Sequence, residues 1–174
     1  MKSLKATDYP ELRIWGDIPP CPRPKVNRQS GRAYYPQKYI NFKRRAELDL
    51  RLQWAKRAPI AAPLDIKVLL LYERPKSRIR KATRDMRTIR SHARGDVDNA
   101  LKSVLDALQA AGVFQNDNQV YKITVEQWFC GENEKPHAEI FLRAVSEGHW
   151  RASSTEMARP KDPGDARQLL FDLG

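Results

Sequence analysis

Three aspartates and one lysine stand near one another in the middle of the chain, at spacings that suit metal-assisted chemistry. Asp96 and Asp98 are two residues apart, Lys102 follows Asp98 by four, and Asp117 comes shortly after Gly112. Mg²⁺ takes hard oxygen ligands and leaves positions open for phosphate and water, so phosphodiester cleavage needs carboxylates that converge on one point. The four residues are candidates for such a centre, provided that the chain folds back and brings Asp117 to the other two.

A helix is predicted to position these side chains. Residues 96–111 have helical periodicity, and Gly112 is a natural stop. An extended lead-in directs alternate side chains to one side, and a helix starting at Asp98 places Lys102 above it. The apolar side of this helix is predicted to comprise Leu101, Val104, Leu105 and Leu108, and the polar side Asn99, Lys102, Ser103 and Asp106.

Each of these features also has a purely structural explanation. Asp96 or Asp98 could cap the helix, and Lys102 with Asp106 could form an ordinary surface pair. The run Asn116-Asp117-Asn118 could owe its composition to turn chemistry. Spacing alone favours the structural explanation.

The remaining pattern indicates one α+β domain. A short strand is expected over residues 11–17, a long helix over 37–57 and a buried strand over 64–72. Residues 120–129 and 138–145 are predicted to form an antiparallel hairpin around a turn at 131–135. The domain is expected to span residues 11–145, between an N-terminal tail, 1–10, and a flexible C-terminal tail, 146–174.

Composition points to a polyanionic partner. The chain has 174 residues, a formal net charge of +11 and a sequence pI of about 9.9. Its longest apolar run, residues 66–72, is interrupted by Lys67 and is much shorter than a bilayer span. Cys21 and Cys130 form neither a disulfide framework nor a zinc-finger spacing, and no signal-peptide stretch is apparent. We expect a cytoplasmic protein that does not enter membranes.

Two segments concentrate the positive charge. Residues 74–94 hold nine Lys or Arg against one acid and are predicted to form a mobile DNA-contacting arm, with a solvated linker as the alternative. A second patch includes Tyr34 and Tyr35, which could stack on unpaired bases or belong to the core. The predicted DNA-binding residues are Arg23, Lys25, Arg28, Arg32, Lys76, Arg78, Arg80, Lys81, Arg84, Arg87, Arg90 and Arg94.

A family resemblance favours the catalytic explanation. The run Gly95-Asp-Val-Asp-Asn-Ala-Leu-Lys-Ser-Val-Leu-Asp-Ala-Leu, followed by Asn116-Asp-Asn-Gln-Val120, resembles the signature of the RusA family of Holliday-junction resolvases. That signature is D-x-D-N-x-x-K-x-x-x-D-A-L and then, after a short gap, D-D-x-Q-V. The resemblance is strongest over residues 95–120 and extends more loosely over 11–145.

The resemblance implies a compact α+β homodimer, with helices on a small mixed sheet, that nicks four-way DNA junctions using Mg²⁺, or Mn²⁺ in its place. Asp96, Asp98 and Asp117 fall on the family's acidic metal-binding triad and Lys102 on its catalytic lysine. Asn116 departs from the pattern, which often has the first of two tandem acids there. We expect Asp117, the acid that this chain retains, to be the ligand.

Two rival functions remain at the level of sequence. One is a metal nuclease acting on flaps, forks or RNA, and the other is a basic nucleic-acid-binding protein without activity. A four-way junction has two-fold symmetry and is cut on two strands, which also favours a homodimer. Near the C-terminus, Gln168 to Phe171 loosely resembles the peptides that dock on bacterial sliding clamps; a terminal turn folded onto the body is the alternative.

Overall fold

A mixed sheet is built around a central strand, β5 (Leu64–Tyr72). In the computed structural model, which describes residues 7–79, 84–90 and 96–145, β5 pairs in parallel with β7 (Val120–Phe129) and antiparallel with β8 (His137–Ala144). Strands β1 (Thr7–Asp8) and β2 (Leu12–Trp15) both pair with the outer edge of β8. The short strand β6 (Thr88–Ile89) pairs with the far end of β7. The predicted small mixed sheet is confirmed, and it begins at Thr7, within the segment expected to be a tail.

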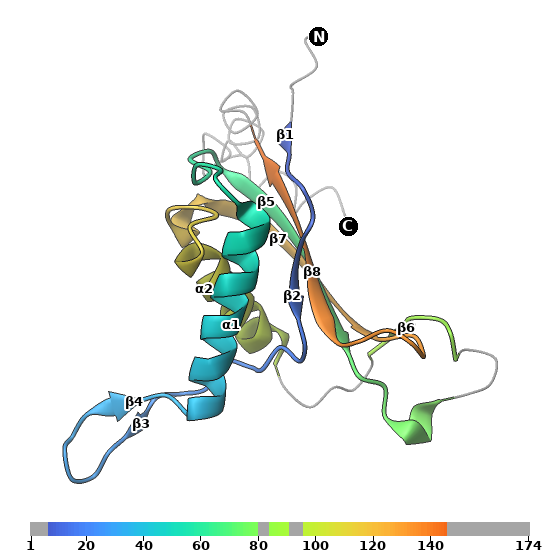
Figure 1. Cartoon of the computed structure of the whole chain (residues 1–174), viewed down its shortest axis with the longest axis horizontal. Helices are drawn as coiled ribbons and strands as arrows, with labels where there is room; N and C mark the ends of the chain where they lie inside the picture. The colour runs from blue at the N-terminus through green and yellow to red at the C-terminus, as the bar shows by residue number, and fades with distance from the viewer. Residues whose placement is uncertain (1–6, 80–83, 91–95, 146–174) are drawn as a thin grey trace, which may run out of the picture.

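The predicted hairpin of residues 120–129 and 138–145 is wrong, although both strands exist. β7 and β8 lie on opposite sides of β5 and do not pair with each other. Leu64, Ile66, Val68 and Leu70 of β5 are fully buried, so this strand gains most from the central position between two neighbours. The turn between β7 and β8 therefore passes across the end of β5 (Figure 1).

Two helices cover one face of the sheet (Figure 1). Helix α1 (Gln37–Trp54) buries the side chains at the predicted three- and four-residue steps: Tyr39, Phe42, Ala46, Leu50 and Trp54. Helix α2 (Val97–Ala110) packs on α1 and β7, and its buried residues are Ala100, Ser103, Val104, Ala107 and Leu108. The buried side of α2 is therefore rotated from the predicted one, and Leu101 and Leu105 lie half-buried at its margin.

A second, two-stranded sheet extends from the body as a hairpin (Figure 1). It consists of β3 (Lys25–Val26) and β4 (Ala33–Tyr34), which pair with each other. This hairpin was not predicted, because its two-residue strands are too short to show a hydrophobic alternation. Two 3₁₀ turns complete the described elements: η1 (Lys76–Arg78) after β5 and η3 (Asp117–Gln119) before β7.

No helix in the described part of the chain is both long and apolar enough to cross a bilayer. The predicted C-terminal tail, with its possible clamp-binding peptide Gln168 to Phe171, lies outside the described residues, as do Arg80, Lys81 and Arg94.

Candidate metal centre and nucleic-acid surfaces

The first half of the candidate metal centre lies at the N-terminal end of α2. Asp96 occupies the N-cap position, yet its side chain makes no capping hydrogen bond. Its carboxylate accepts a hydrogen bond, at 3.4 Å, from the Asn99 side chain. Asp98 follows in the first turn, and both aspartates are exposed to solvent. Capping therefore does not occupy the Asp96 carboxylate, and the two acids offer hard oxygen ligands of the kind that Mg²⁺ prefers.

Lys102 is also exposed, one turn after Asp98. The surface pair that could have explained it structurally is absent from the described residues, because Asp106 pairs with Lys43 of α1 at 3.9 Å. The Lys102 ammonium therefore remains available to a ligand near Asp98.

The second half of the centre lies in η3. Asn116 caps this turn by accepting a hydrogen bond from the Asn118 backbone at 3.0 Å, and the Gln119 side chain accepts one from the Asn116 backbone at 2.9 Å. Gln119 also donates to the Ile60 carbonyl at 2.9 Å, which fixes the turn to the segment before β5. Asp117 is exposed. Asn116 thus has a structural task that Asn and Asp perform about equally well, whereas the Asp117 side chain projects from a fixed turn.

Within one chain, Asp117 is held far from Asp96 and Asp98. Helix α2 has 14 residues and is therefore about 20 Å long at 1.5 Å per residue. The Gln109 side chain in its last turn donates to the Gln115 carbonyl, which places η3 beside the C-terminal end of α2. Asp96 and Asp98 lie at the other end (Figure 1). Within a single chain, Asp117 therefore does not fold back to Asp96 and Asp98, as a metal centre built from one chain would require.

One other group of ligand-type side chains does converge. Within the described ranges, Glu134, His137 and Glu139 are the three such residues whose ligand atoms lie within 4.8 Å of one another. The guanidinium of Arg87 already occupies this cluster, because it donates to Glu134 at 2.9 Å and to Glu139 at 2.7 Å. The hydrogen bond from Arg87 holds the pKa of the Glu139 carboxyl below its usual range. An internal cation thus balances these acids, and the cluster does not fit a resident metal ion.

The Arg87 cluster anchors much of the segment that was predicted to be a mobile arm. The Arg74 side chain is buried and donates to the Met86 carbonyl, and Arg84 pairs with Glu132. Backbone of this segment also approaches closely, since a Cβ on Gly131 would lie 2.8 Å from the Asp85 carbonyl oxygen. Residues 84–90 therefore pack against the β7–β8 turn, and Arg84 and Arg87 have structural partners that their sequence neighbourhood did not reveal. Contacts of this segment with DNA stay a prediction.

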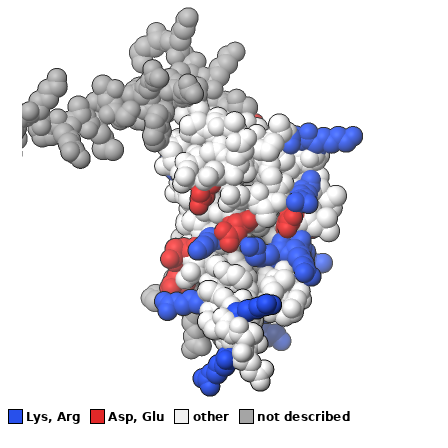
Figure 2. All heavy atoms as spheres, turned by 90° about the vertical axis from the view of Figure 1, so that its left-hand side faces the viewer, with Lys and Arg blue, Asp and Glu red and all other residues white. Residues whose placement is uncertain are grey.

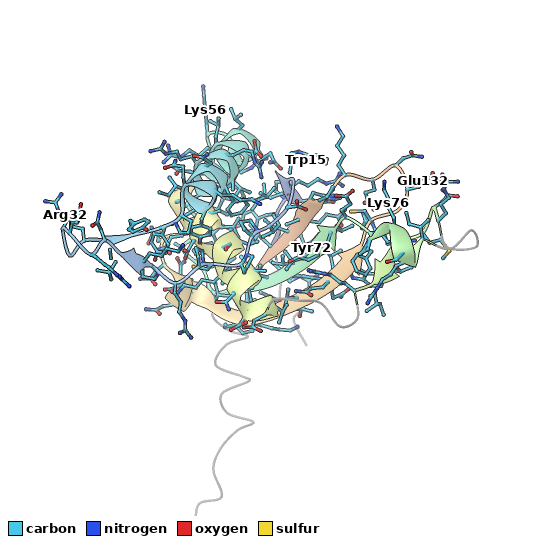
Figure 3. The ribbon with its side chains drawn as sticks, turned by 90° about the horizontal axis from the view of Figure 1, so that it is seen from below. Trp15, Arg32, Lys56, Tyr72, Lys76 and Glu132 are labelled. Atoms are coloured by element: carbon cyan, nitrogen blue, oxygen red, sulfur yellow. The ribbon has the colours of Figure 1, made fainter. Side chains whose placement is uncertain are left out.

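The second basic patch is different. Between Ile18 and Ala46 the chain carries eight Lys or Arg and no acid. Arg23, Lys25, Arg28 and Arg32 are all exposed on or beside the β3–β4 hairpin. Figure 2 faces the side from which the hairpin projects, and the lower part of that view shows Lys and Arg without Asp or Glu. Arg32 at the hairpin tip and Lys76 of η1 lie at opposite sides of the molecule in Figure 3.

The aromatic residues of this patch are not part of the core. Tyr34 and Tyr35 are both exposed, and the Tyr35 ring contacts that of Tyr39 at a centroid distance of 5.6 Å. Burial raises the pKa of the Cys130 thiol to about 11, which disfavours the reactive thiolate at this cysteine.

Comparison with known proteins identifies the class of enzyme to which this chain belongs. The family model described as "Endodeoxyribonuclease RusA" matches residues 17–143, a range that contains Asp96, Asp98 and Asp117, both helices and strands β3 to β7 with most of β8. The protein is therefore a nuclease, a hydrolase that acts on phosphodiester bonds. The chain belongs to the RusA endodeoxyribonuclease family.

Two relatives are similar to this chain, and one of them carries the RusA name. The "Crossover junction endodeoxyribonuclease RusA" of Aquifex aeolicus is 28% identical over 106 residues, which cover 59% of this chain and 70% of the relative. The "Uncharacterized protein YqaN" of Bacillus subtilis is 26% identical over 145 residues, which cover 80% of this chain and 99% of the relative.

Proposed function

We propose that this protein is a cytoplasmic, Mg²⁺-dependent endonuclease that resolves four-way DNA junctions by paired symmetric nicks in DNA recombination and repair. The proposal rests on the position of the family motif, which falls on three exposed acids, Asp96, Asp98 and Asp117. Among the described residues, the carboxylates of these acids neither cap a helix nor form ion pairs. The name of the Aquifex aeolicus relative supports the junction as substrate.

The active centre is shared between two copies of the chain. One α2 helix separates Asp96 and Asp98 from Asp117, so a single chain holds two incomplete half-sites. A two-fold axis that sets two α2 helices antiparallel brings the Asp117 end of one copy to the Asp96 end of the other. The same operation creates two equivalent centres, one for each strand that must be cut.

The surface beside α2 suits such a dimer. Leu101 and Leu105 lie half-buried along the margin of α2, and Val97 is exposed one turn earlier on the same stripe. The neighbouring strand β7 exposes Tyr121 and Ile123 near Asp117. Exposed apolar side chains that join two half-sites are the kind of surface that an isologous contact buries.

The chain's own residues then have separate tasks. Asp96 and Asp98 of one copy and Asp117 of the other would hold the ion, which supplies polarisation of the scissile phosphate and a lowered pKa for the attacking water. Lys102 stabilises negative charge on the phosphate oxygens as a point charge. The exposed cations of the hairpin bind the DNA backbone and hold the junction against this centre.

The direct test uses a labelled four-way junction with and without Mg²⁺, with the nicks mapped on all strands. We expect paired nicks at symmetric positions near the branch point that require the metal. Asp98→Asn should lower nicking by roughly 100-fold or more, while junction binding in Ca²⁺ stays within about twofold. Junction binding without nicking by the unaltered protein would indicate an inactive binding protein, and faster cleavage of flaps, forks or RNA would indicate the other rival. Either result would reject the proposal.

A further inference from the structure

The β3–β4 hairpin is a preorganised element. Its strands pair Lys25 with Tyr34 and Val26 with Ala33. The Asn27 side chain accepts hydrogen bonds from the backbone of Gln29 at 2.8 Å and Ser30 at 3.3 Å, and this Asx turn shapes the tip. Gly31 adopts a positive φ of 66° there. The tip therefore has a defined shape before any ligand binds.

The hairpin is tied to the half-site that holds Asp96 and Asp98. The Cys21 backbone donates to the Asn99 carbonyl at 2.9 Å, and the Ser103 hydroxyl donates to the Pro19 carbonyl at 2.8 Å. Prolines restrict the backbone between these anchors and β3. Val26 is five positions after Cys21, which limits the distance between them to about 17 Å. The base of the hairpin is therefore held within about 17 Å of the anchor at the first turn of α2.

The two faces of the hairpin differ in chemistry. Directly paired residues share a face, so Lys25 and Tyr34 lie on one side and Val26 and Ala33 on the other. Val26 is 63% exposed and Tyr34 49% exposed, because the hairpin has no other strand or helix of the described chain paired with it. A projecting ribbon with an apolar face, an aromatic ring and surrounding cations suits insertion into nucleic acid. Arginine and lysine bind phosphates, while valine and tyrosine cover the faces of unstacked bases.

We infer that the β3–β4 hairpin is a wedge that occupies the branch point, where Val26 and Tyr34 cover exposed base-pair faces, and that it makes the enzyme prefer branched over linear DNA. The inference rests on the proposed function and adds the element that selects the substrate. Wedging into continuous duplex requires unstacking of a base step, whereas a branch point already interrupts the stack. The wedge therefore stabilises the junction complex and leaves the duplex complex almost unchanged.

The test uses 2-aminopurine at the branch point of a four-way junction, with a second junction labelled in the middle of one arm and a linear duplex of the same sequence. Binding is measured without Mg²⁺, so that no cutting occurs. For the unaltered protein we expect a rise in 2-aminopurine fluorescence at the branch point and tighter binding to the junction than to the duplex. The double variant Val26→Ser, Tyr34→Ala should lose the fluorescence rise and roughly 10-fold or more of the junction preference, with duplex affinity within about twofold.

The control variant Val26→Ile, Tyr34→Phe keeps the apolar group and the ring and should behave like the unaltered protein. Circular dichroism of both variants should be unchanged, because neither side chain is part of the core. A double variant that keeps the branch-point signal, or that loses duplex and junction affinity by the same factor, would overturn the wedge. Nicking by the unaltered protein is measured in parallel with Mg²⁺ and tests the proposed function separately. The fluorescence measurement does not depend on cutting, so the two results can be told apart.

Discussion

The β3–β4 hairpin and the segment of residues 84–90 are both basic, and they differ in what surrounds their cations. Around the hairpin the chain has no acid between Ile18 and Ala46, so its arginines face solvent. Arg84 and Arg87 instead meet Glu132, Glu134 and Glu139 from the distant β7–β8 region. Positive charge thus has two settings in one small protein: on the hairpin it is exposed to solvent, and in the Arg87 cluster it holds residues 84–90 against the β7–β8 turn.

The difference teaches that local charge density does not identify a DNA-binding surface. Residues 74–94 have the higher density of Lys and Arg, yet the carboxylates that neutralise part of it lie more than forty positions later in the chain. The deciding observation is whether a cation already has a buried partner. Glu139, with a side chain only 7% exposed, is such a partner for Arg87.

The largest expected effect on stability comes from removing the Arg87 side chain from its pair with Glu139. Arg87→Ala leaves Glu139 charged, buried and without its main hydrogen-bond donor, so we expect the free energy of unfolding to fall by about 3 kcal/mol. Arg87→Lys keeps the charge without the two-pronged geometry and should lose less. Arg28→Ala in the hairpin should change stability by no more than about 0.5 kcal/mol. Urea unfolding of the three variants measures this contrast, and equal losses for Arg87→Ala and Arg28→Ala would break it.

The hairpin should show the opposite pattern in DNA binding. The triple variant Lys25→Ala, Arg28→Ala, Arg32→Ala should lose roughly 10- to 100-fold in junction affinity at low salt, with unchanged stability. The slope of log affinity against log salt should decrease in magnitude by about 2 to 3, because each lost phosphate contact removes about 0.9. Lys56→Ala is a control at another exposed cation. If the triple variant bound DNA with the unaltered salt slope, the hairpin would not be the binding surface.

Low pH is expected to have a smaller effect on the stability of the protein. The folded-state pKa of Glu139 lies below the ordinary glutamate value of 4.5, chiefly because of the hydrogen bond from Arg87. Its contribution to stability is therefore fully present above about pH 4.5 and is lost as the pH falls through the folded-state pKa. Glu139→Gln should flatten this part of the stability curve, measured by thermal unfolding between pH 6 and pH 3 in roughly half-unit steps. If the Glu139→Gln variant lost stability between about pH 6 and pH 3 as steeply as the unaltered protein, Glu139 would not be the group responsible for the acid dependence.

Much of the fold could be predicted from local pattern. The apolar run of β5 and the stripe of α1 each satisfy the period of one element, and both were located closely. Strand order could not be predicted in this way, because the turn between β7 and β8 has the composition of a hairpin turn, and burial of β5 decides the pairing. The β3–β4 hairpin was missed because it is held by an Asx turn rather than by hydrophobic alternation.

The members of the candidate site come from the sequence motif and stay a prediction, whereas the way the fold places them could not be predicted. The motif located Asp96, Asp98, Lys102 and Asp117, and the capping role of Asn116 explains why an amide is acceptable there. Sequence spacing placed Asp117 after α2 and could not reveal that η3 is pinned to Ile60 at the far end of that helix. The assembly of the centre from two chains follows from this separation and remains our proposal.

A mixed dimer tests the shared centre most directly. Chains carrying Asp98→Asn and chains carrying Asp117→Asn are given different affinity tags, produced together, and purified through both tags. If each centre combines Asp98 of one copy with Asp117 of the other, the mixed dimer contains one intact centre and one doubly altered centre. We predict that each homodimer is inactive and that the mixed dimer regains Mg²⁺-dependent nicking of one strand per junction. A mixed dimer as inactive as both homodimers would contradict the account.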